Sequence, residues 1–108
     1  MNFNFKEIFT AFMVLFAVID IIGNIPIIID LRNNSGGNPG MVQLLSSYFF
    51  ESDRPIHLNS IYSRPSDTTW QYWTLPYVPG VRFPETDLYI LTSGHTFSGA
   101  EEFAYNMV

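Results

Sequence analysis

The chain has 108 residues, no cysteine and a formal net charge of −5 at pH 7. The absence of cysteine excludes a disulfide framework, a thiolate nucleophile and a cysteine metal site. The charge provides no basic stripe for nucleic acid, so we expect no nucleic-acid partner. A hydrophobic content of 47% and an aromatic content of 17% argue against disorder. A chain of this length forms one small domain only if its hydrophobic N-terminal part is included or a partner replaces it.

Residues 8–29 are mostly apolar, and a stretch of 22 residues suits a helix that crosses a bilayer. Asp20 would be costly within a membrane unless it faced a partner, and Pro26 would end or kink the helix. A cleaved signal peptide fits less well, because Lys6 stands beside Glu7 and no small-residue cleavage site follows. A buried helix of a soluble domain is the other alternative. We expect an N-terminal hydrophobic helix that packs little against the rest of the chain.

Part of this stretch resembles the first transmembrane segment of MarC-like integral membrane proteins, which are bacterial. The residues that carry the likeness are Leu15-Phe-Ala-Val-Ile-Asp-Ile-Ile-Gly-Asn-Ile-Pro-Ile27. The likeness covers residues 1 to about 32, and no later apolar run is long enough to span a bilayer. It implies contact with a membrane through residues 8–29 and a membrane-associated or cell-envelope location.

The apolar run ends in a predicted strand that stops near Leu31, followed by an Asn- and Gly-rich loop at residues 32–40. The amides of such a loop can converge on an oxyanion, although most glycine loops are only turns. Asn38 as the N-cap and Pro39 at the first helical position predict a helix over about residues 39–50.

Residues 56–63 and 68–75 alternate like strands around a turn at residues 64–67, which predicts a hairpin. The hairpin carries three large aromatic residues. A shelf for a peptide or a carbohydrate is one interpretation of them, and packing within the hairpin is the better supported one. The three are Trp70, Tyr72 and Trp73.

A last strand over residues 87–92 leads through a short loop to Ser98, where a helix is predicted to begin at or just after the serine. A hydroxyl at such a turn is exposed, with the next amide and the helix N-terminus aimed at developing negative charge. Nucleophilic serines need that arrangement. The alternative is an ordinary N-cap, with Glu101 completing a capping box. The order of elements predicts an α/β layer structure whose first and last strands are parallel.

Three other polar residues are interpreted as structural rather than catalytic. Asp30 and Arg32 flank the glycine loop, where we expect a salt bridge or a loop clamp. His57 lies on a predicted strand and is interpreted as a surface or packed residue. No set of Asp, Glu or His residues in the sequence has metal-ligand spacing.

Two stretches, taken in order, resemble the tail-specific (C-terminal processing) serine peptidases, most closely the branch similar to interphotoreceptor retinoid-binding protein. They are Ile28-Ile-Asp-Leu-Arg-Asn-Asn-Ser-Gly-Gly37 and Leu91-Thr-Ser-Gly-His-Thr-Phe-Ser-Gly-Ala-Glu-Glu-Phe-Ala-Tyr105. The resemblance covers about residues 27–107 and implies a partial crotonase-like α/β fold. It divides the chain into a hydrophobic leader at residues 1–26 and a partial peptidase domain at residues 27–108.

The resemblance implies that Ser98 is the nucleophile and that the amide of Gly99, with an amide of Ser35 or Gly36, forms the oxyanion hole. It implies acyl transfer on peptide or protein substrates, without a metal or cofactor. His95 is assigned no catalytic role, because a base must reach the hydroxyl from a separate element.

In this family the residues that activate the serine lie largely outside the stretch that the chain resembles. We therefore expect the chain to be a fragment that is inactive alone, and to join pieces of two genes. The alternative function is that of a non-enzymatic, membrane-anchored piece of a MarC-like protein.

Overall fold

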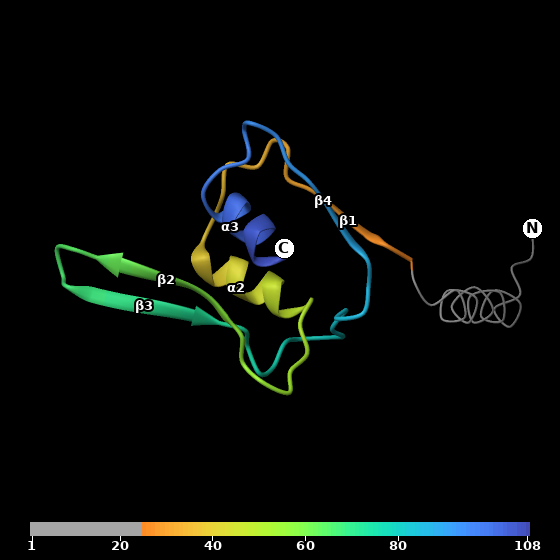
Figure 1. The fold of residues 1–108 in the computed structure, drawn as a ribbon, viewed down its shortest axis with the longest axis horizontal. Helices are drawn as coiled ribbons and strands as arrows, with labels where there is room; N and C mark the ends of the chain where they lie inside the picture. The colour runs from red at the N-terminus through yellow and green to blue at the C-terminus, as the bar shows by residue number, and fades with distance from the viewer. Residues whose placement is uncertain (1–24) are drawn as a thin grey trace, which may run out of the picture.

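The computed structural model describes residues 25–108, and the helix expected at residues 8–24 lies outside the described residues. The elements follow the predicted order of strand, helix, hairpin, strand and helix (Figure 1). They are β1 (Ile27–Asp30), α2 (Pro39–Ser47), β2 (His57–Ser63), β3 (Thr68–Trp73), β4 (Leu88–Leu91) and α3 (Gly99–Asn106). None of the helices formed by residues 25–108 has the length and apolar character that a bilayer span requires.

Strands β1 and β4 form a parallel pair, as predicted, with Ile27 opposite Leu88 and Asp30 opposite Leu91. Burial alternates along both strands, so that one face of the pair is half-buried and the other is exposed. Because the strands are parallel, their carboxyl ends lie at the same edge of the sheet. The glycine loop after β1 and the serine loop after β4 therefore leave the sheet side by side (Figure 1).

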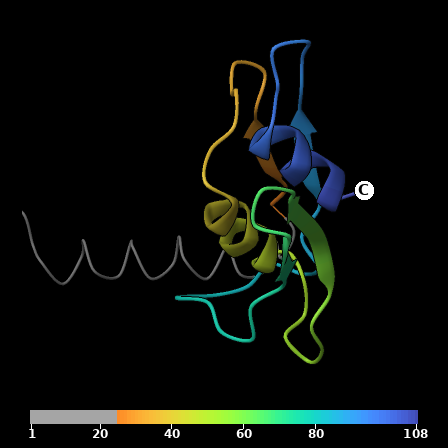
Figure 2. The ribbon, with the colours of Figure 1, turned by 90° about the vertical axis from the view of Figure 1, so that its left-hand side faces the viewer.

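The two helices lie next to each other and carry the core (Figure 2). Leu31, Val42, Ala100 and Phe103 are buried together, at 7%, 7%, 5% and 2% exposure. The ring of Phe49 packs edge-on against Phe103, with centroids 6.2 Å apart. Apolar side chains of β1, β4 and the ends of both helices surround this cluster. The core thus fixes the start of α3 relative to the first turns of α2.

The hairpin of β2 and β3 projects away from this body (Figure 1). Trp70 lies opposite Ile61, and Trp73 lies opposite His57, with ring centroids of the latter pair 5.0 Å apart. Side chains alternate along β3, so Trp70 and Tyr72 share one face and Trp73 lies on the other. The three aromatic residues therefore do not form a single shelf.

The guanidinium of Arg82 binds carbonyl oxygens at and beyond the C-terminal end of α2. It donates hydrogen bonds to the carbonyls of Ser47 at 2.5 Å, Phe50 at 3.3 Å and Leu75 at 2.5 Å. The Ser47 hydroxyl donates to the Gln43 carbonyl at 2.7 Å and accepts from the Leu75 amide at 2.9 Å. These bonds join the segment after the hairpin to the helix, and α2 ends at Ser47 rather than near residue 50.

Replacing Arg82 by alanine will leave carbonyl oxygens at the end of α2 without their donors. We expect Arg82→Ala to lower the free energy of unfolding by about 1–3 kcal/mol, the cost of leaving part-buried polar groups unpaired. Urea unfolding followed by circular dichroism measures this loss. Arg64→Ala removes the same charge from the exposed hairpin turn and should change stability little. An equal loss in both variants would contradict the role given to Arg82.

Candidate active site

Ser98 occupies a strained position at the turn between β4 and α3. Its backbone has φ 55° and ψ −125°, a region that non-glycine residues seldom adopt. The N-cap of α2, Asn38, has the usual extended backbone at φ −67° and ψ 131°. Conformations like that of Ser98 cost about 1–3 kcal/mol and persist only where surrounding contacts impose them. The turn therefore resembles a nucleophile elbow more closely than an ordinary cap.

Ser98 is both an exposed residue and part of a capping box. Its backbone amide donates to Oε2 of Glu101 at 3.1 Å, and its side chain lies opposite the backbone of Glu101, as the predicted capping box requires. The residue is exposed despite these contacts. The hydroxyl is thus available to a reacting group.

The glycine loop lies in close contact with the serine turn. A Cβ atom on Gly36 would lie 2.8 Å from the Cβ of Ser98 and 2.8 Å from the amide nitrogen of Gly99. Gly36 also has φ +112°, which side chains rarely tolerate. A Cβ on Gly99 would lie 3.1 Å from the nitrogen of Gly37. The structure thus brings the loop and the serine together, as the sequence predicts.

The backbone amides near Ser98 differ in whether they already donate a hydrogen bond within the protein. The Gly36 amide donates to Oδ1 of Asn34 at 2.9 Å, so a side chain of the loop already engages it. Within residues 25–108, the amides of Gly37 and Gly99 donate no hydrogen bond to the protein. Gly99 is the first residue of α3, where amides have no partner inside the helix. Ser35 lies on the exposed outer part of the loop.

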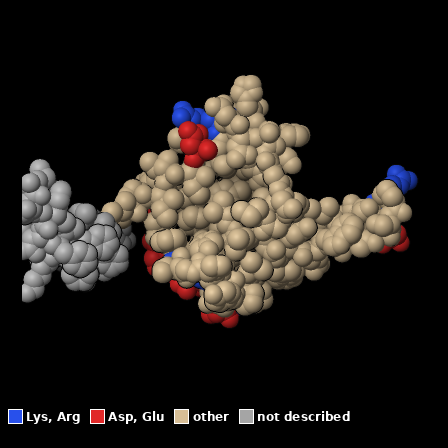
Figure 3. Space-filling model, turned by 180° about the vertical axis from the view of Figure 1, so that it is seen from behind, with Lys and Arg blue, Asp and Glu red and all other residues tan. Residues whose placement is uncertain are grey.

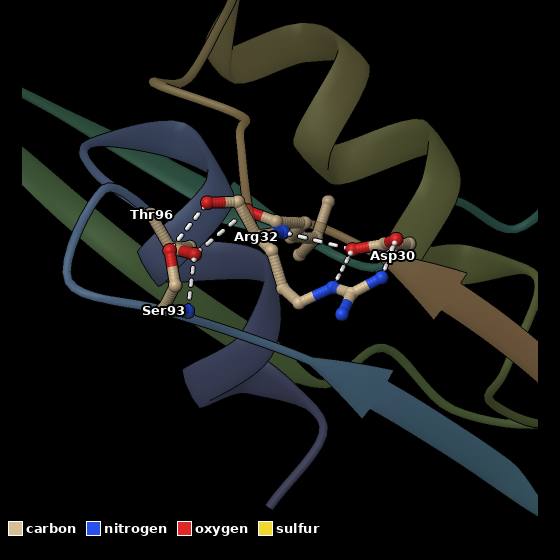
Figure 4. Close-up of polar contacts among 5 residues, drawn as sticks. Asp30, Arg32, Ser93 and Thr96 are labelled. Carbon is tan, nitrogen blue, oxygen red and sulfur yellow. Dashed lines mark hydrogen bonds and ion pairs between the residues drawn. The ribbon is translucent and has the colours of Figure 1, made fainter.

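A small hydrogen-bond network ties the serine loop to the end of β1 (Figure 4). The buried hydroxyl of Thr96 donates to the Leu31 carbonyl at 2.7 Å and accepts from the Ser93 amide at 3.0 Å. The Ser93 hydroxyl donates to the Arg32 carbonyl and accepts from the His95 amide at 3.1 Å. Sequence reasoning did not identify Ser93 and Thr96. The available signal was two hydroxyl residues in a short loop, where they often bind backbone groups.

Asp30 and Arg32 form the predicted clamp at the start of the glycine loop (Figure 4). Nε and Nη2 of Arg32 donate to the two carboxylate oxygens of Asp30 at 3.0 and 2.8 Å, and the Arg32 amide donates to Oδ1 at 3.0 Å. The side-chain hydrogen bonds from Arg32, followed by its backbone hydrogen bond, lower the pKa of Asp30 from 3.8 to about 2. Both side chains are exposed, at 59% for Arg32 and 50% for Asp30. Figure 3 shows one face of the molecule, on which basic and acidic side chains appear at a few separate places and most of the described surface is uncharged.

The hydrogen bonds from Arg32 predict that the Asp30 carboxyl titrates at low pH. NMR observation of the Asp30 carboxyl carbon should give a pKa of about 2, and Arg32→Ala should return it toward 3.8. Since the folded-state pKa is the lower one, the contribution of this pair to folding is present above the unfolded pKa. It is lost as pH falls from about 4 to 2. Arg64→Ala is the control and should leave the Asp30 pKa unchanged. An unshifted Asp30 in the original chain would contradict the clamp.

The two histidines of the chain lie apart from this chemistry. His95 is exposed in the loop before the serine. His57 packs on Trp73 in the hairpin, and its Nε2 is 2.9 Å from the Ser60 hydroxyl. Neither imidazole forms a hydrogen bond with Ser98 in the part of the chain that the structure describes. The assignment of no catalytic role to His95 stays a prediction.

An exposed serine on a strained strand-to-helix turn, beside unengaged amides, is typical of hydrolases that work by acyl transfer. The model of Peptidase family S41 matches residues 19–107. The match covers most of the chain and includes both the glycine loop and the serine turn, so the chain belongs to this family. This supports the resemblance to tail-specific peptidases. It begins before the predicted boundary at residue 27, and it gives no support to the MarC-like alternative.

Proposed function

We propose that this chain carries the nucleophile and the oxyanion-binding part of a serine peptidase. Ser98 Oγ attacks the carbonyl carbon of a peptide bond, and the amine leaves as an acyl-enzyme forms. Water then attacks the ester and releases the acid. The observation that carries the proposal is the strained backbone of the exposed Ser98, which is held against a glycine loop.

The oxyanion donors follow from which amides are free. Gly99 is the residue after the nucleophile and begins α3, whose N-terminus favours negative charge. We assign the second donor to Gly37, in place of the Ser35 or Gly36 amides expected from the sequence. The Gly36 amide donates to Asn34, whereas the Gly37 amide donates to no protein group in residues 25–108, and its nitrogen would lie 3.1 Å from a Cβ on Gly99. One such donor contributes about 10²–10³ to the rate in serine peptidases.

The proton of Ser98 needs a base, which passes it to the leaving amine. No side chain in residues 25–108 forms a hydrogen bond with the Ser98 hydroxyl. We propose that the base is supplied from outside this segment, as the family resemblance implies.

Three features stay predictions of the sequence. They are membership of the branch similar to interphotoreceptor retinoid-binding protein, contact with a membrane through residues 8–29, and a membrane-associated or cell-envelope location. The expected substrates are peptides or protein tails, which fits the peptidase family.

The missing base predicts that the 108-residue chain has negligible peptidase turnover by itself. Residues 27–107, placed in a full-length member of the family in exchange for its own segment, should restore hydrolysis of a fluorogenic peptide. In that protein Ser98→Ala should abolish turnover, and His95→Ala should retain most of it. Hydrolysis by the chain alone, lost in a folded His95→Ala variant, would show that the base lies within the chain.

Gly36 supplies a second test in the same chimaeric protein. Gly36→Ala places a Cβ 2.8 Å from both the Ser98 side chain and the Gly99 amide nitrogen, so the loop must move away from the serine. Displacements of about 1 Å near reacting groups can cost about 10²-fold, and we expect at least that loss in kcat/KM. Gly94→Ala, whose Cβ would meet nothing within 4 Å, is the control. Similar activities of the two variants would argue against the loop's role.

A further inference from the structure

The hydroxyl of Thr96 interrupts the hydrogen-bond ladder between β1 and β4 at the edge of the sheet that carries the site. The last direct bond there runs from the Leu31 amide to the Leu91 carbonyl, at 2.8 Å. With this parallel register, the next ladder bond would run from the Ser93 amide to the Leu31 carbonyl. Instead, the Thr96 hydroxyl accepts from the Ser93 amide at 3.0 Å and donates to the Leu31 carbonyl at 2.7 Å. A side chain is therefore inserted between the two strands (Figure 4).

The insertion keeps the chain after β4 apart from the end of β1. A direct bond from an amide to a carbonyl spans about 2.9 Å, whereas two hydrogen bonds in series reach further. The turn that supplies the hydroxyl is closed by the Thr96 amide, which donates to the Ser93 carbonyl at 3.1 Å. The ladder thus ends here, and the two loops of the proposed site separate from this point.

Ser93 adds a second side-chain bond to the neighbouring carbonyl. Its hydroxyl donates to the carbonyl of Arg32, the residue after Leu31, and accepts from the His95 amide at 3.1 Å. Within residues 25–108, no backbone amide of the loop at residues 92–97 donates to either carbonyl. Two consecutive carbonyls after β1 are therefore bound to the serine loop by its hydroxyl groups.

The position of Thr96 determines the position of the nucleophile. Thr96 is 6% exposed, and in the described chain it is the one buried residue between β4 and Ser98. Only Phe97 separates the two, and its side chain is 66% exposed and provides little anchorage. The Phe97 amide donates to the Asn34 carbonyl at 3.2 Å, which links this part of the turn to the glycine loop. A shift of Thr96 therefore moves Ser98 relative to that loop.

We propose that Thr96 is a positioning residue for the proposed acyl transfer, supported by Ser93. Its inserted hydroxyl sets the separation of the two loops at which Ser98 Oγ and the amides of Gly37 and Gly99 can act on one carbonyl group of the substrate. The inference rests on the proposed function. Neither supporting hydroxyl is assigned a contact with substrate or a step of proton transfer.

Removal of the Thr96 hydroxyl frees the two groups that it separates. The Ser93 amide can then bond the Leu31 carbonyl directly, which extends the ladder by one bond and draws the serine loop towards β1. Thr96→Val removes the hydroxyl and keeps the branched shape, whereas Thr96→Ser keeps the hydroxyl. Thr74→Val is the matched control, because Thr74 is 5% exposed and its hydroxyl also accepts from a backbone amide, that of Ile56, at 2.8 Å.

The first measurement is NMR of the 108-residue chain, and it does not depend on catalysis. The α protons of Gly36 and the β protons of Ser98 should show a nuclear Overhauser effect, since a Cβ on Gly36 would lie 2.8 Å from the Ser98 Cβ. We expect this signal to persist in Thr96→Ser and Thr74→Val and to be lost or strongly weakened in Thr96→Val. Full retention of the signal in a folded Thr96→Val variant would overturn the proposal.

The second measurement is the kinetics of the chimaeric peptidase described above, with kcat expressed per folded molecule. Displacements of about 1 Å near reacting groups can cost about 10²-fold, so Thr96→Val should lower kcat at least about tenfold. KM should change little, because no contact with substrate is removed. Thr96→Ser should recover most of the lost kcat, and Thr74→Val should keep the original value. An equal loss in Thr96→Val and Thr74→Val would reduce Thr96 to a structural residue.

Ser93→Ala keeps the test decisive if Thr96→Val does not fold, because Ser93 is exposed. This variant should weaken the signal between Gly36 and Ser98 and lower kcat. Ser60→Ala, at an exposed serine of the hairpin, should do neither. Unchanged values in Ser93→Ala would then overturn the proposal.

The two measurements separate the inference from the proposed function. If the NMR signal is lost in Thr96→Val but kcat does not fall, the positioning role is wrong and the proposed function stands. If Ser98→Ala in the chimaera retains turnover, the proposed function fails and the catalytic importance of Thr96 fails with it.

Discussion

The contact between Gly36 and the Ser98–Gly99 backbone is the constraint on which the site depends. It leaves no room for a Cβ atom, and it places a loop from β1 and a turn from β4 against each other. The parallel pairing of β1 with β4 makes this possible, because both segments leave the same edge of the sheet. The bond from the Phe97 amide to the Asn34 carbonyl, at 3.2 Å, adds a direct link between the two loops.

The strain at Ser98 is maintained by its surroundings on two sides. On one side, Thr96 is bonded to the Leu31 carbonyl, so the loop before the serine cannot relax without unpairing a buried hydroxyl. On the other, Ala100 and Phe103 anchor the first turns of α3 in the core. The energy of the strained backbone, about 1–3 kcal/mol, is offset by the burial of Phe103, which contributes about 1.5–3 kcal/mol. The nucleophile's geometry is therefore a property of the packing and not of Ser98 alone.

The parts of the fold that sequence reasoning predicted best are those with local chemical signals. Asn38 and Pro39 predict the start of α2, and the Asn38 side chain accepts from the Gly40 amide at 2.7 Å. The predicted end of α2 was less accurate, because Arg82, which lies far along the chain, donates hydrogen bonds to carbonyls at that end. Such long-range bonds have no local signature.

The same difference between local and long-range signals applies to the candidate site. The spacing of Ser98 and Glu101 predicted the helix start and the capping box, whereas the backbone angles of Ser98 depend on a contact with a distant glycine. The proposed change of donor from Gly36 to Gly37 rests on a local signal. Asn34 lies two residues before Gly36, and Asn side chains commonly accept from the amide at that position, as here.

In the proposed function, residues 25–108 supply positioning and charge stabilisation, and the base for proton transfer comes from elsewhere. In serine peptidases that lose members of the triad, the oxyanion hole and substrate binding still leave about 10³–10⁴ of rate enhancement over water. The roles proposed for Ser98, Gly99 and Gly37 are of that kind. The larger part of catalysis requires a base that reaches the exposed hydroxyl from another element. On this proposal, the site within residues 25–108 holds the scissile carbonyl, and the rate of the reaction depends on the base that reaches the exposed side of Ser98.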